Sequence, residues 1–350
     1  MSAYPWTKNY PKGVPSEIGE LEFNNLLDLF EKSFKENSSK VAYENMGKQL
    51  TYKEVDDLST NFAAFLQNRW GLKKGDSIAI QMPNLLQYPV VLIGALKAGL
   101  IVVNTNPLYT PREMKHQYLD AGVKAVVIVA NFASNLEKIR SETGVGNIIV
   151  TELGDMLGGV KGWLVNTVVK HVKKMVPAYQ LDGAIGIKKA LSIGANSSYS
   201  RPEIDAEDPA FLQYTGGTTG VSKGAQLSHK NIIAHTKQTT FWFKPLLEQS
   251  KDHLMITAIP LYHIFALTVN GILMLSVGAK NILITNPRDM NGFVKELKKH
   301  KFTLMTGVNT LFNGLLNQEA FKEVDFSNLF GTIGGGMAVQ DAVAKKWETL

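Results

Sequence analysis

Short apolar runs alternate with amphipathic helical patterns in the first third of this chain, and this alternation restricts the fold more than any other feature. Apolar residues at helical spacing follow Asn24, and a second helical pattern covers residues 51–70. Two runs typical of buried strands are SIAIQM, ending at Met82, and AVVIVA, ending at Ala130, with a mixed pattern over 90–103 between them. Strands that alternate with helices predict an α/β architecture with crossover helices.

The alternation is interrupted once. Residues 151–205 contain more glycine and lysine and fewer strand-like runs, so we expect a connecting region there. The pattern returns after Asp208, with candidate strands AFLQYT, LMITAI, NILIT and TLMTGV. A chain of 350 residues exceeds the usual size of one domain. We therefore divide it into a first part, 1–205, and a second part, 206–350.

Composition excludes several functional classes. The chain has no cysteine, which removes disulfides, thiolate metal sites and cysteine nucleophiles. Its 37 basic and 31 acidic residues give a net charge of +6, which suits a partner that carries phosphate groups or anionic lipid. A nucleic-acid partner is disfavoured because the excess is modest and no basic–aromatic motif is present. The sequence motifs of zinc and serine hydrolases are also absent.

The sequence predicts a cytoplasmic protein. Its N-terminal segment is polar and interrupted by prolines, unlike a signal peptide. The longest apolar stretch, 90–103, contains Lys97 and is too short to span a bilayer.

Residues 163–179 form a basic amphipathic pattern that we expect to be helical and to end at Pro177. Apolar residues fall on one side of this helix, and Lys170, Lys173 and Lys174 fall on the other. Such a helix suits peripheral contact with an anionic membrane, on the inner face of the cell membrane. It equally suits an ordinary surface helix that packs on its own domain, and the sequence does not decide between these readings.

A glycine- and threonine-rich segment, YTGGTTGVSKG at 214–224, carries the strongest chemical signal. Glycines let the backbone approach an anion, and successive N–H groups then form a concave nest for phosphate oxygens. We expect this loop to lie between a strand and a helix that starts near Ser228. It is not a Walker A loop, because the required glycine–lysine spacing is missing. The candidate phosphate-binding residues are Thr215, Gly216, Gly217, Thr218, Thr219, Gly220, Ser222 and Lys223.

Four segments in order resemble conserved motifs of the acyl-adenylate-forming enzymes, the superfamily of acyl-CoA synthetases, adenylation domains and luciferases. Besides the phosphate loop they are MPNLLQYPVVLIGALKAGLIVVNTNPLYTPREMKHQ at 82–117, IPLYHIF at 259–265 and IGGGM at 333–337. The stretches PLYHIFALTVN, NILITNPRD and TGVNTLFNGLLN further resemble bacterial long-chain fatty-acid CoA ligases.

This resemblance implies the large N-terminal domain of the adenylate-forming fold, with stacked mixed sheets flanked by helices. It also implies a long-chain fatty acid as substrate, ATP and CoA as co-substrates, and Mg²⁺ as cofactor, with the hydroxyl of Thr215 as a metal contact. The implied adenine-binding residues are Gly334, Gly335, Gly336 and Met337, and the implied acyl-pocket residues are His263, Phe265, Val308 and Thr310. The family's acidic block, ribose-binding aspartate, hinge and small C-terminal domain are not found, so we expect a truncated chain without a complete catalytic set and with impaired activity.

Alternatives remain at this stage. Another acyl-adenylating ligase, for medium-chain or aryl acids, fits the same motifs, and so does a non-catalytic fragment that binds nucleotide or lipid. His263 among apolar neighbours also suits a residue packed in the core, and Gly334–Gly336 also suits a turn without a ligand.

Overall fold

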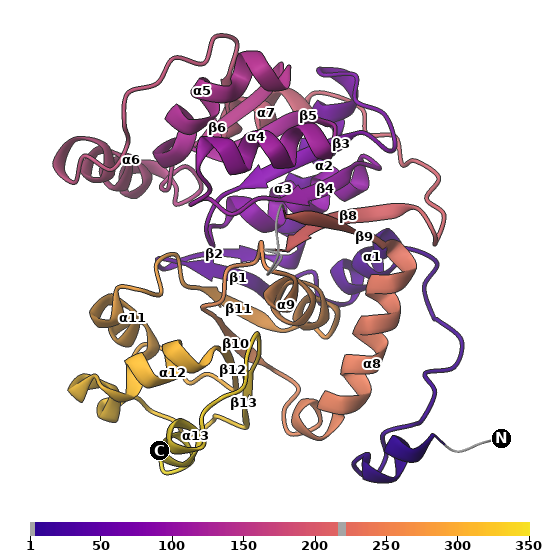
Figure 1. Ribbon diagram of the computed structural model, residues 1–350, viewed down its shortest axis with the longest axis vertical. Helices are drawn as coiled ribbons and strands as arrows, with labels where there is room; N and C mark the ends of the chain where they lie inside the picture. Colours follow the sequence, from indigo (N-terminus) through magenta and orange to yellow (C-terminus); the bar gives the residue numbers. More distant parts are fainter. Residues whose placement is uncertain (1–3, 216–221) are drawn as a thin grey trace.

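The computed structural model of the protein describes residues 4–215 and 222–350. These residues form two β-sheets, which lie one above the other in the view of Figure 1. Helices cover both sheets, so the predicted α/β fold with stacked mixed sheets is confirmed. No described helix is both long and apolar enough to cross a membrane.

The seven-stranded sheet runs in the order β7 (Ile185–Gly186), β6 (Asn147–Thr151), β5 (Val123–Val129), β3 (Ser77–Gln81), β4 (Ile101–Asn104), β8 (Pro209–Thr215) and β9 (Lys223–Ser228). Its strands are parallel except for β9, which is antiparallel to β8. Two helices, α4 (Pro111–Asp120) and α5 (Ala133–Thr143), pack on the face that presents Val103 and Val126. Three others, α2 (Tyr52–Asn68), α3 (Gln87–Lys97) and α7 (Ile187–Ala195), pack on the opposite face, with Val102 and Val127.

The six-stranded sheet runs in the order β13 (Gly331–Gly334), β12 (Leu304–Gly307), β10 (Leu254–Thr257), β11 (Lys280–Leu283), β1 (Val41–Asn45) and β2 (Lys48–Thr51). Only the β1–β2 pair among these strands is antiparallel. Three helices, α11 (Met290–Leu297), α12 (Asn309–Leu316) and α13 (Asp341–Trp347), pack with Ile256 and Met305. On the other face, with Met255 and Leu304, lie α8 (His229–Leu247), α10 (Met274–Ser276) and the π-helical segment η4 (Leu267–Leu273).

The remaining helical elements are η1 (Pro5–Asn9), α1 (Leu26–Asn37), η2 (Ala130–Phe132), α6 (Gly159–Thr167), the π-helical segment η3 (Val168–Val172), α9 (Ile264–Ala266) and η5 (Glu319–Glu323). Helix α1 begins after Asn25, whose side chain accepts a hydrogen bond from the N–H of Leu27. The predicted end of the 163–179 helix at Pro177 is wrong. The helical segment ends at Val172, and the N–H of Lys173 bonds to the carbonyl of Val168.

Both sheets contain strands from both halves of the chain. The first part, 1–205, contributes β1 and β2 to the six-stranded sheet, and the second part, 206–350, contributes β8 and β9 to the seven-stranded sheet. The connecting region 151–205 contains β7, which extends the seven-stranded sheet, and α7, which packs on α2. The position 205/206 is therefore not a boundary between the sheets.

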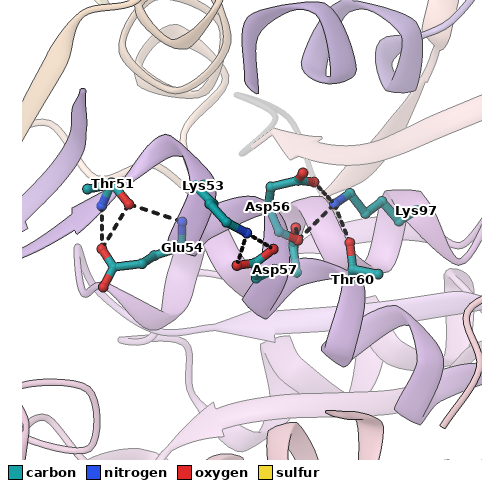
Figure 2. Close-up of polar contacts among 8 residues, drawn as sticks. Thr51, Lys53, Glu54, Asp56, Asp57, Thr60 and Lys97 are labelled. Carbon is teal, nitrogen blue, oxygen red and sulfur yellow. Dashed lines mark hydrogen bonds and ion pairs between the residues drawn. The ribbon is translucent and has the colours of Figure 1, made fainter. Parts of the chain in front are cut away.

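Helix α2 is held tightly between α3 and α7. Gly94 of α3 and Gly194 of α7 each face its backbone so closely that an added Cβ would overlap it. Figure 2 shows the polar side of this contact, where the buried ammonium group of Lys97 lies 2.5 Å from Asp56 and 2.8 Å from the hydroxyl of Thr60. Burial lowers the pKa of Lys97, and the charge of Asp56 opposes that effect.

A capping box formed by Thr51 and Glu54, also in Figure 2, starts α2.

We predict that His229 makes the fold sensitive to acid. Its Nδ1 accepts a hydrogen bond from the N–H of Leu26 at 3.2 Å, and burial lowers its pKa to about 4. Because a histidine in the unfolded chain titrates near 6.5, the unfolded state takes up the proton first as the pH falls. The free energy of unfolding should therefore fall below pH 6.5, by about 2 kcal/mol between pH 7 and pH 5, and level off below pH 4.

Urea unfolding at several pH values checks this prediction. The control variant His229→Asn keeps a non-titrating acceptor near Nδ1, so its stability should change less over the same interval. Equal pH dependence of the two proteins would show that His229 is not responsible.

Candidate nucleotide and acyl site

The predicted phosphate loop joins two antiparallel strands. Thr215, the last residue of β8, pairs with Lys223, the first residue of β9. The predicted helix start near Ser228 is confirmed, because α8 begins after Ser228, which caps it. Between the loop and this helix lies the strand β9, which the sequence analysis did not indicate. The predicted residues Gly216, Gly217, Thr218, Thr219 and Gly220 lie outside the described residues.

Three described residues of this hairpin, Thr215, Ser222 and Lys223, lie together where its strands meet the loop. The hydroxyl of Ser222 donates a hydrogen bond to the carbonyl of Thr215 at 2.8 Å. Thr215 and Lys223 are exposed. Two oxygen-bearing side chains and one ammonium group are thus presented at a single position, which suits an anionic ligand.

Helix α4 supports this hairpin from the side. His116 lies 2.8 Å, through Nε2, from the carbonyl of Ser222, and because a carbonyl only accepts, the ring must donate this bond. One turn later, Asp120 accepts a hydrogen bond of 2.5 Å from the hydroxyl of Tyr214. Burial raises the pKa of Tyr214, and the neighbouring Asp120 raises it further. The hairpin is therefore fixed to α4 at both of its strands.

The sequence interpretation did not select His116 or Asp120. The sequence does indicate that these two residues share one side of a helix, because they are four positions apart and the helix begins with a capping box of Thr110 and Glu113. Their spacing places them on one side of α4, but nothing local indicates that this side faces a segment about 100 residues later.

The glycine-rich segment 334–336 begins at Gly334, the last residue of β13. The N–H of Gly335 bonds to the carbonyl of Gly307 at 3.1 Å. The ring of Phe265 lies against Gly335 so closely that a Cβ there would be 2.6 Å from Cε1 of the ring. On Gly336, with φ of 77°, a Cβ would lie 3.7 Å from Val308. Two residues predicted to line the acyl pocket thus contact the segment predicted to bind adenine.

The other predicted residues of these two groups are exposed. Met337 is 63% exposed, and Thr310 lies at the surface in the first turn of α12. His263 precedes α9 and lies beside the ring of Tyr262, with ring centroids 4.5 Å apart. His263 is partly exposed, which disfavours the core-residue reading, and its partial burial lowers its pKa.

Buried side chains of the seven-stranded sheet and its connections hold the segment before His263. Asn84, which lies in the MPN motif, donates hydrogen bonds to the carbonyls of Thr257 and Ile259 and accepts one of 2.8 Å from the N–H of Leu261. Gln213 of β8 donates a hydrogen bond of 2.8 Å to the carbonyl of Tyr262. The first and third motifs along the chain are thereby linked directly, and the residue before the second motif, Gln213, is bonded to the third.

The described oxygen ligands beside the hairpin fit Mg²⁺. This ion prefers oxygen ligands and is commonly shared between a protein and substrate phosphates. Thr215 supplies a hydroxyl at the exposed end of β8, so the residues present suit a metal that is held mainly by a bound nucleotide.

A second polar cluster lies elsewhere, between β1 and α11. Within the described residues, Glu44, Glu296 and His300 have side-chain ligand atoms within 4.8 Å of one another. Lys280 lies 2.6 Å from Glu44, and Lys299 lies 2.6 Å from Glu296. Bonding to His300 and Lys299 lowers the pKa of Glu296 to about 2. The Nε2 of His300, which follows α11, also lies 4.0 Å from Glu44 of β1, so the end of this helix lies beside the sheet.

We predict that Gly335→Ala destabilises the protein by about 1–3 kcal/mol, because the new methyl group must displace the ring of Phe265. Urea unfolding measures this change. The double variant Gly335→Ala/Phe265→Leu should lose less stability than the sum of its two single variants, since leucine lacks the obstructing ring atoms. Additive losses would contradict the contact.

The described residues define an α/β protein that combines a β-hairpin, whose loop is predicted to bind phosphate, with a glycine-rich segment at the end of a parallel strand. Residues 30–350 match the family described as AMP-binding enzyme. The chain belongs to this family.

Within this family, the chain is similar to several CoA ligases. The chain is 52% identical to a long-chain-fatty-acid–CoA ligase of Escherichia coli O157:H7 and 54% identical to one of Haemophilus influenzae, over 99% of its own length in both cases. It spans 61% and 62% of the length of these two relatives. A 4-coumarate–CoA ligase of rice is 26% identical over 95% of the chain and 56% of the relative.

Solved structures show the same fold. A long-chain-fatty-acid–CoA ligase from Archaeoglobus fulgidus superimposes with a TM-score of 0.78 at 20% identity, covering 97% of this chain and 63% of that one. An anthranilate CoA ligase in complex with anthranoyl-AMP gives 0.79 at 18% identity, covering 94% and 58%.

Proposed function

We propose that this protein activates long-chain fatty acids to acyl-CoA through an acyl-adenylate, with ATP and CoA as co-substrates. The observation that carries the proposal is that Phe265 and Val308 lie beside Gly335 and Gly336, so that residues we propose to line the acyl pocket adjoin residues we propose to bind adenine. An acyl-adenylate needs such an arrangement, since its acyl and adenosine groups are attached to one phosphate. The two bacterial relatives described as long-chain-fatty-acid–CoA ligases support the same substrate class.

In the first step, the fatty carboxylate would attack the α-phosphate of ATP and release pyrophosphate. No general base is required, because the carboxylate is already ionised at neutral pH. Lys223 would balance the charge of the β- and γ-phosphates, and the hydroxyl of Ser222 would donate a hydrogen bond to them in place of its bond to the carbonyl of Thr215. His116 would keep Ser222 in place through its carbonyl. Bound Mg²⁺, in contact with the hydroxyl of Thr215, would neutralise charge on the departing pyrophosphate.

In the second step, the thiol of CoA would attack the acyl carbon and displace AMP. The described residues supply no complete catalytic set for this step, and we propose that the 350-residue chain alone has impaired activity. Removing charge-stabilising groups costs roughly 10²–10³-fold in rate for each group.

A chimeric protein tests the proposed activity in a polypeptide of the full length of a relative. Residues 1–350 would replace the corresponding part of the Haemophilus influenzae relative, to which they are 54% identical. We expect palmitate-dependent ATP–pyrophosphate exchange and palmitoyl-CoA formation by the chimera, and weaker exchange by the 350-residue chain. A folded chimera that binds ATP but shows no fatty-acid-dependent exchange would contradict the proposed activity and favour a non-catalytic binding protein.

A series of carboxylates from acetate to palmitate separates the two enzymatic alternatives in the same chimera. Each buried methylene contributes about 0.8 kcal/mol, so kcat/KM should rise with chain length in a long-chain ligase. A maximum at medium-chain acids, or a preference for aryl acids, would overturn the long-chain assignment.

We further propose that the protein acts in the cytoplasm and on the inner face of the cell membrane. Long-chain fatty acids partition into bilayers, so a peripheral position would bring the site close to its substrate.

A further inference from the structure

Helix α6 is attached to the protein by a small, polar stripe. Its Gly162 faces Gly154 so closely that a Cβ on Gly162 would lie 2.4 Å from the carbonyl oxygen of Gly154. One turn later, Asn166 accepts a hydrogen bond of 2.7 Å from the N–H of Gly154. Lys161 donates a hydrogen bond to the carbonyl of Met46. Glycine, asparagine and lysine make these contacts, and Val165 is the apolar residue of α6 that packs against the core.

Several other large apolar side chains of α6, η3 and the residues after them are exposed. Trp163 is 66% exposed and Val172 is 71% exposed, and three further apolar residues of this segment are at least half exposed: Val160, Leu164 and Met175. Figure 1 shows α6 at the outer edge of the molecule, away from both sheets. Several exposed apolar side chains within one short segment mark an interaction surface, since exposed apolar patches on proteins are usually small and scattered.

The apolar surface continues inward. Leu164, Val165 and Val168 line one wall of a groove of about 470 Å³, and Ile284 and Phe293 line the opposite wall. The inner side of α6–η3 thus faces other apolar residues across an open groove.

The same segment carries a strong local positive charge. Residues 156–181 contain no aspartate or glutamate, and they contain four lysines and one histidine: Lys161, Lys170, His171, Lys173 and Lys174. None of the ion pairs among the described residues includes Lys170, Lys173 or Lys174. The groove has two acidic lining residues: Glu296, which is bonded to Lys299 and His300, and Asp289, which accepts a hydrogen bond from the N–H of Gly292.

We infer that residues 159–175 form a lipid-binding surface that docks the protein on an anionic bilayer. This inference rests on the proposed function in one respect: it identifies the surface for the membrane contact proposed above. Exposed aromatic and aliphatic side chains next to lysines match the bilayer interface, where apolar groups enter the acyl region and ammonium groups meet lipid phosphates.

Charge favours lipid over a second copy of the chain. A twofold-symmetric dimer through this surface would bring the same lysines of both copies together, and like charges in contact oppose association. The phosphate groups of an anionic bilayer would instead neutralise the positive charge of these lysines.

Co-sedimentation with phospholipid vesicles tests the inference, without ATP or fatty acid. We expect the 350-residue chain to bind phosphatidylcholine vesicles that contain phosphatidylglycerol, and to bind pure phosphatidylcholine much more weakly. Lys173→Gln/Lys174→Gln should lower the partition coefficient roughly 30-fold, since each lysine contributes about 1 kcal/mol near an anionic surface. The matched control is Lys345→Gln/Lys346→Gln, an adjacent exposed pair in α13 whose loss should have little effect.

A second pair of variants tests whether the exposed apolar side chains enter the bilayer. Trp163→Ser should weaken vesicle binding, and the control Trp6→Ser, at another exposed tryptophan, should not. Equal effects of each variant and its control, or no vesicle binding by the chain, would overturn the inference. So would self-association that Trp163→Ser abolishes and that vesicles do not compete with, because that result would identify a second copy as the occupant. Loss of vesicle binding with intact exchange activity in the chimera would refute only this surface and would leave the proposed activity standing.

Discussion

Gly194→Ala is expected to lower the free energy of unfolding by about 3 kcal/mol or more, because it places a methyl group inside the backbone of a neighbouring helix. A Cβ on Gly194 of α7 would lie 1.8 Å from the carbonyl oxygen of Asn61 in α2 and 2.6 Å from its carbonyl carbon. Side chains can rotate away from a clash, whereas a helical backbone cannot. The two helices would have to separate and open the interior covered by Phe65, which is fully buried.

Urea unfolding and thermal melting measure this loss. Gly146→Ala is the matched control, since its Cβ would meet nothing within 4 Å and its φ is not positive. The control should change stability by less than about 1 kcal/mol. If both variants behave alike, the close packing of α2 and α7 is not present in solution.

Lys223→Met is expected to lower palmitate-dependent ATP–pyrophosphate exchange by about 10²–10³-fold in the chimera described above. Lys223 begins β9 opposite Thr215, is exposed, and belongs to no ion pair among residues 4–215 and 222–350. Its charge is therefore free to act on a nucleotide phosphate. Methionine keeps most of the length of the side chain and removes only the charge.

Two controls accompany this measurement. Lys223→Arg keeps the charge and should recover part of the activity. Lys230→Met, on α8 and paired with Glu207, removes a nearby surface charge and should leave exchange almost unchanged. If Lys223→Met loses no more activity than Lys230→Met, the hairpin does not bind phosphate in the way proposed.

Most of the fold was predictable where a local pattern was strong. The strands β3, β10 and β12 fall within runs that the sequence indicates, and β5, β8 and β11 overlap such runs but begin one or two residues earlier. Helices α1 and α2 begin after side chains that cap them. The sequence interpretation missed β9, whose residues KGAQLS contain no apolar run. This strand lies at the edge of its sheet and is largely exposed, so it needs backbone pairing with β8 rather than buried side chains.

The candidate site was predictable as a set of motifs but not as an assembly. Thr215, Ser222 and Lys223 were selected because their residue types bind anions. His116 was not selected, because its contact with Ser222 joins residues 106 positions apart. Asn84, which holds the segment before His263, was not selected for the same reason: its hydrogen-bond partners lie more than 170 positions away.

The segment 159–175 shows most clearly what the sequence alone does not predict. The sequence revealed its amphipathic character but left open whether the apolar side faces the protein. The structure shows that Gly162 and Asn166 make the contact and that Trp163 and Val172 are exposed.

Residue types and their spacing determined the α/β class and the helix starts of this protein and predicted an anion-binding loop, because those properties depend on a few neighbouring residues. Only the tertiary structure decided which strands share a sheet, which motifs meet and which side of each helix faces solvent. Those outcomes depend on close contacts between backbones and on hydrogen bonds between residues distant in sequence, such as Gly194 against Asn61 and Gln213 with Tyr262. No local pattern encodes such a contact, because its energy depends on both partners at once.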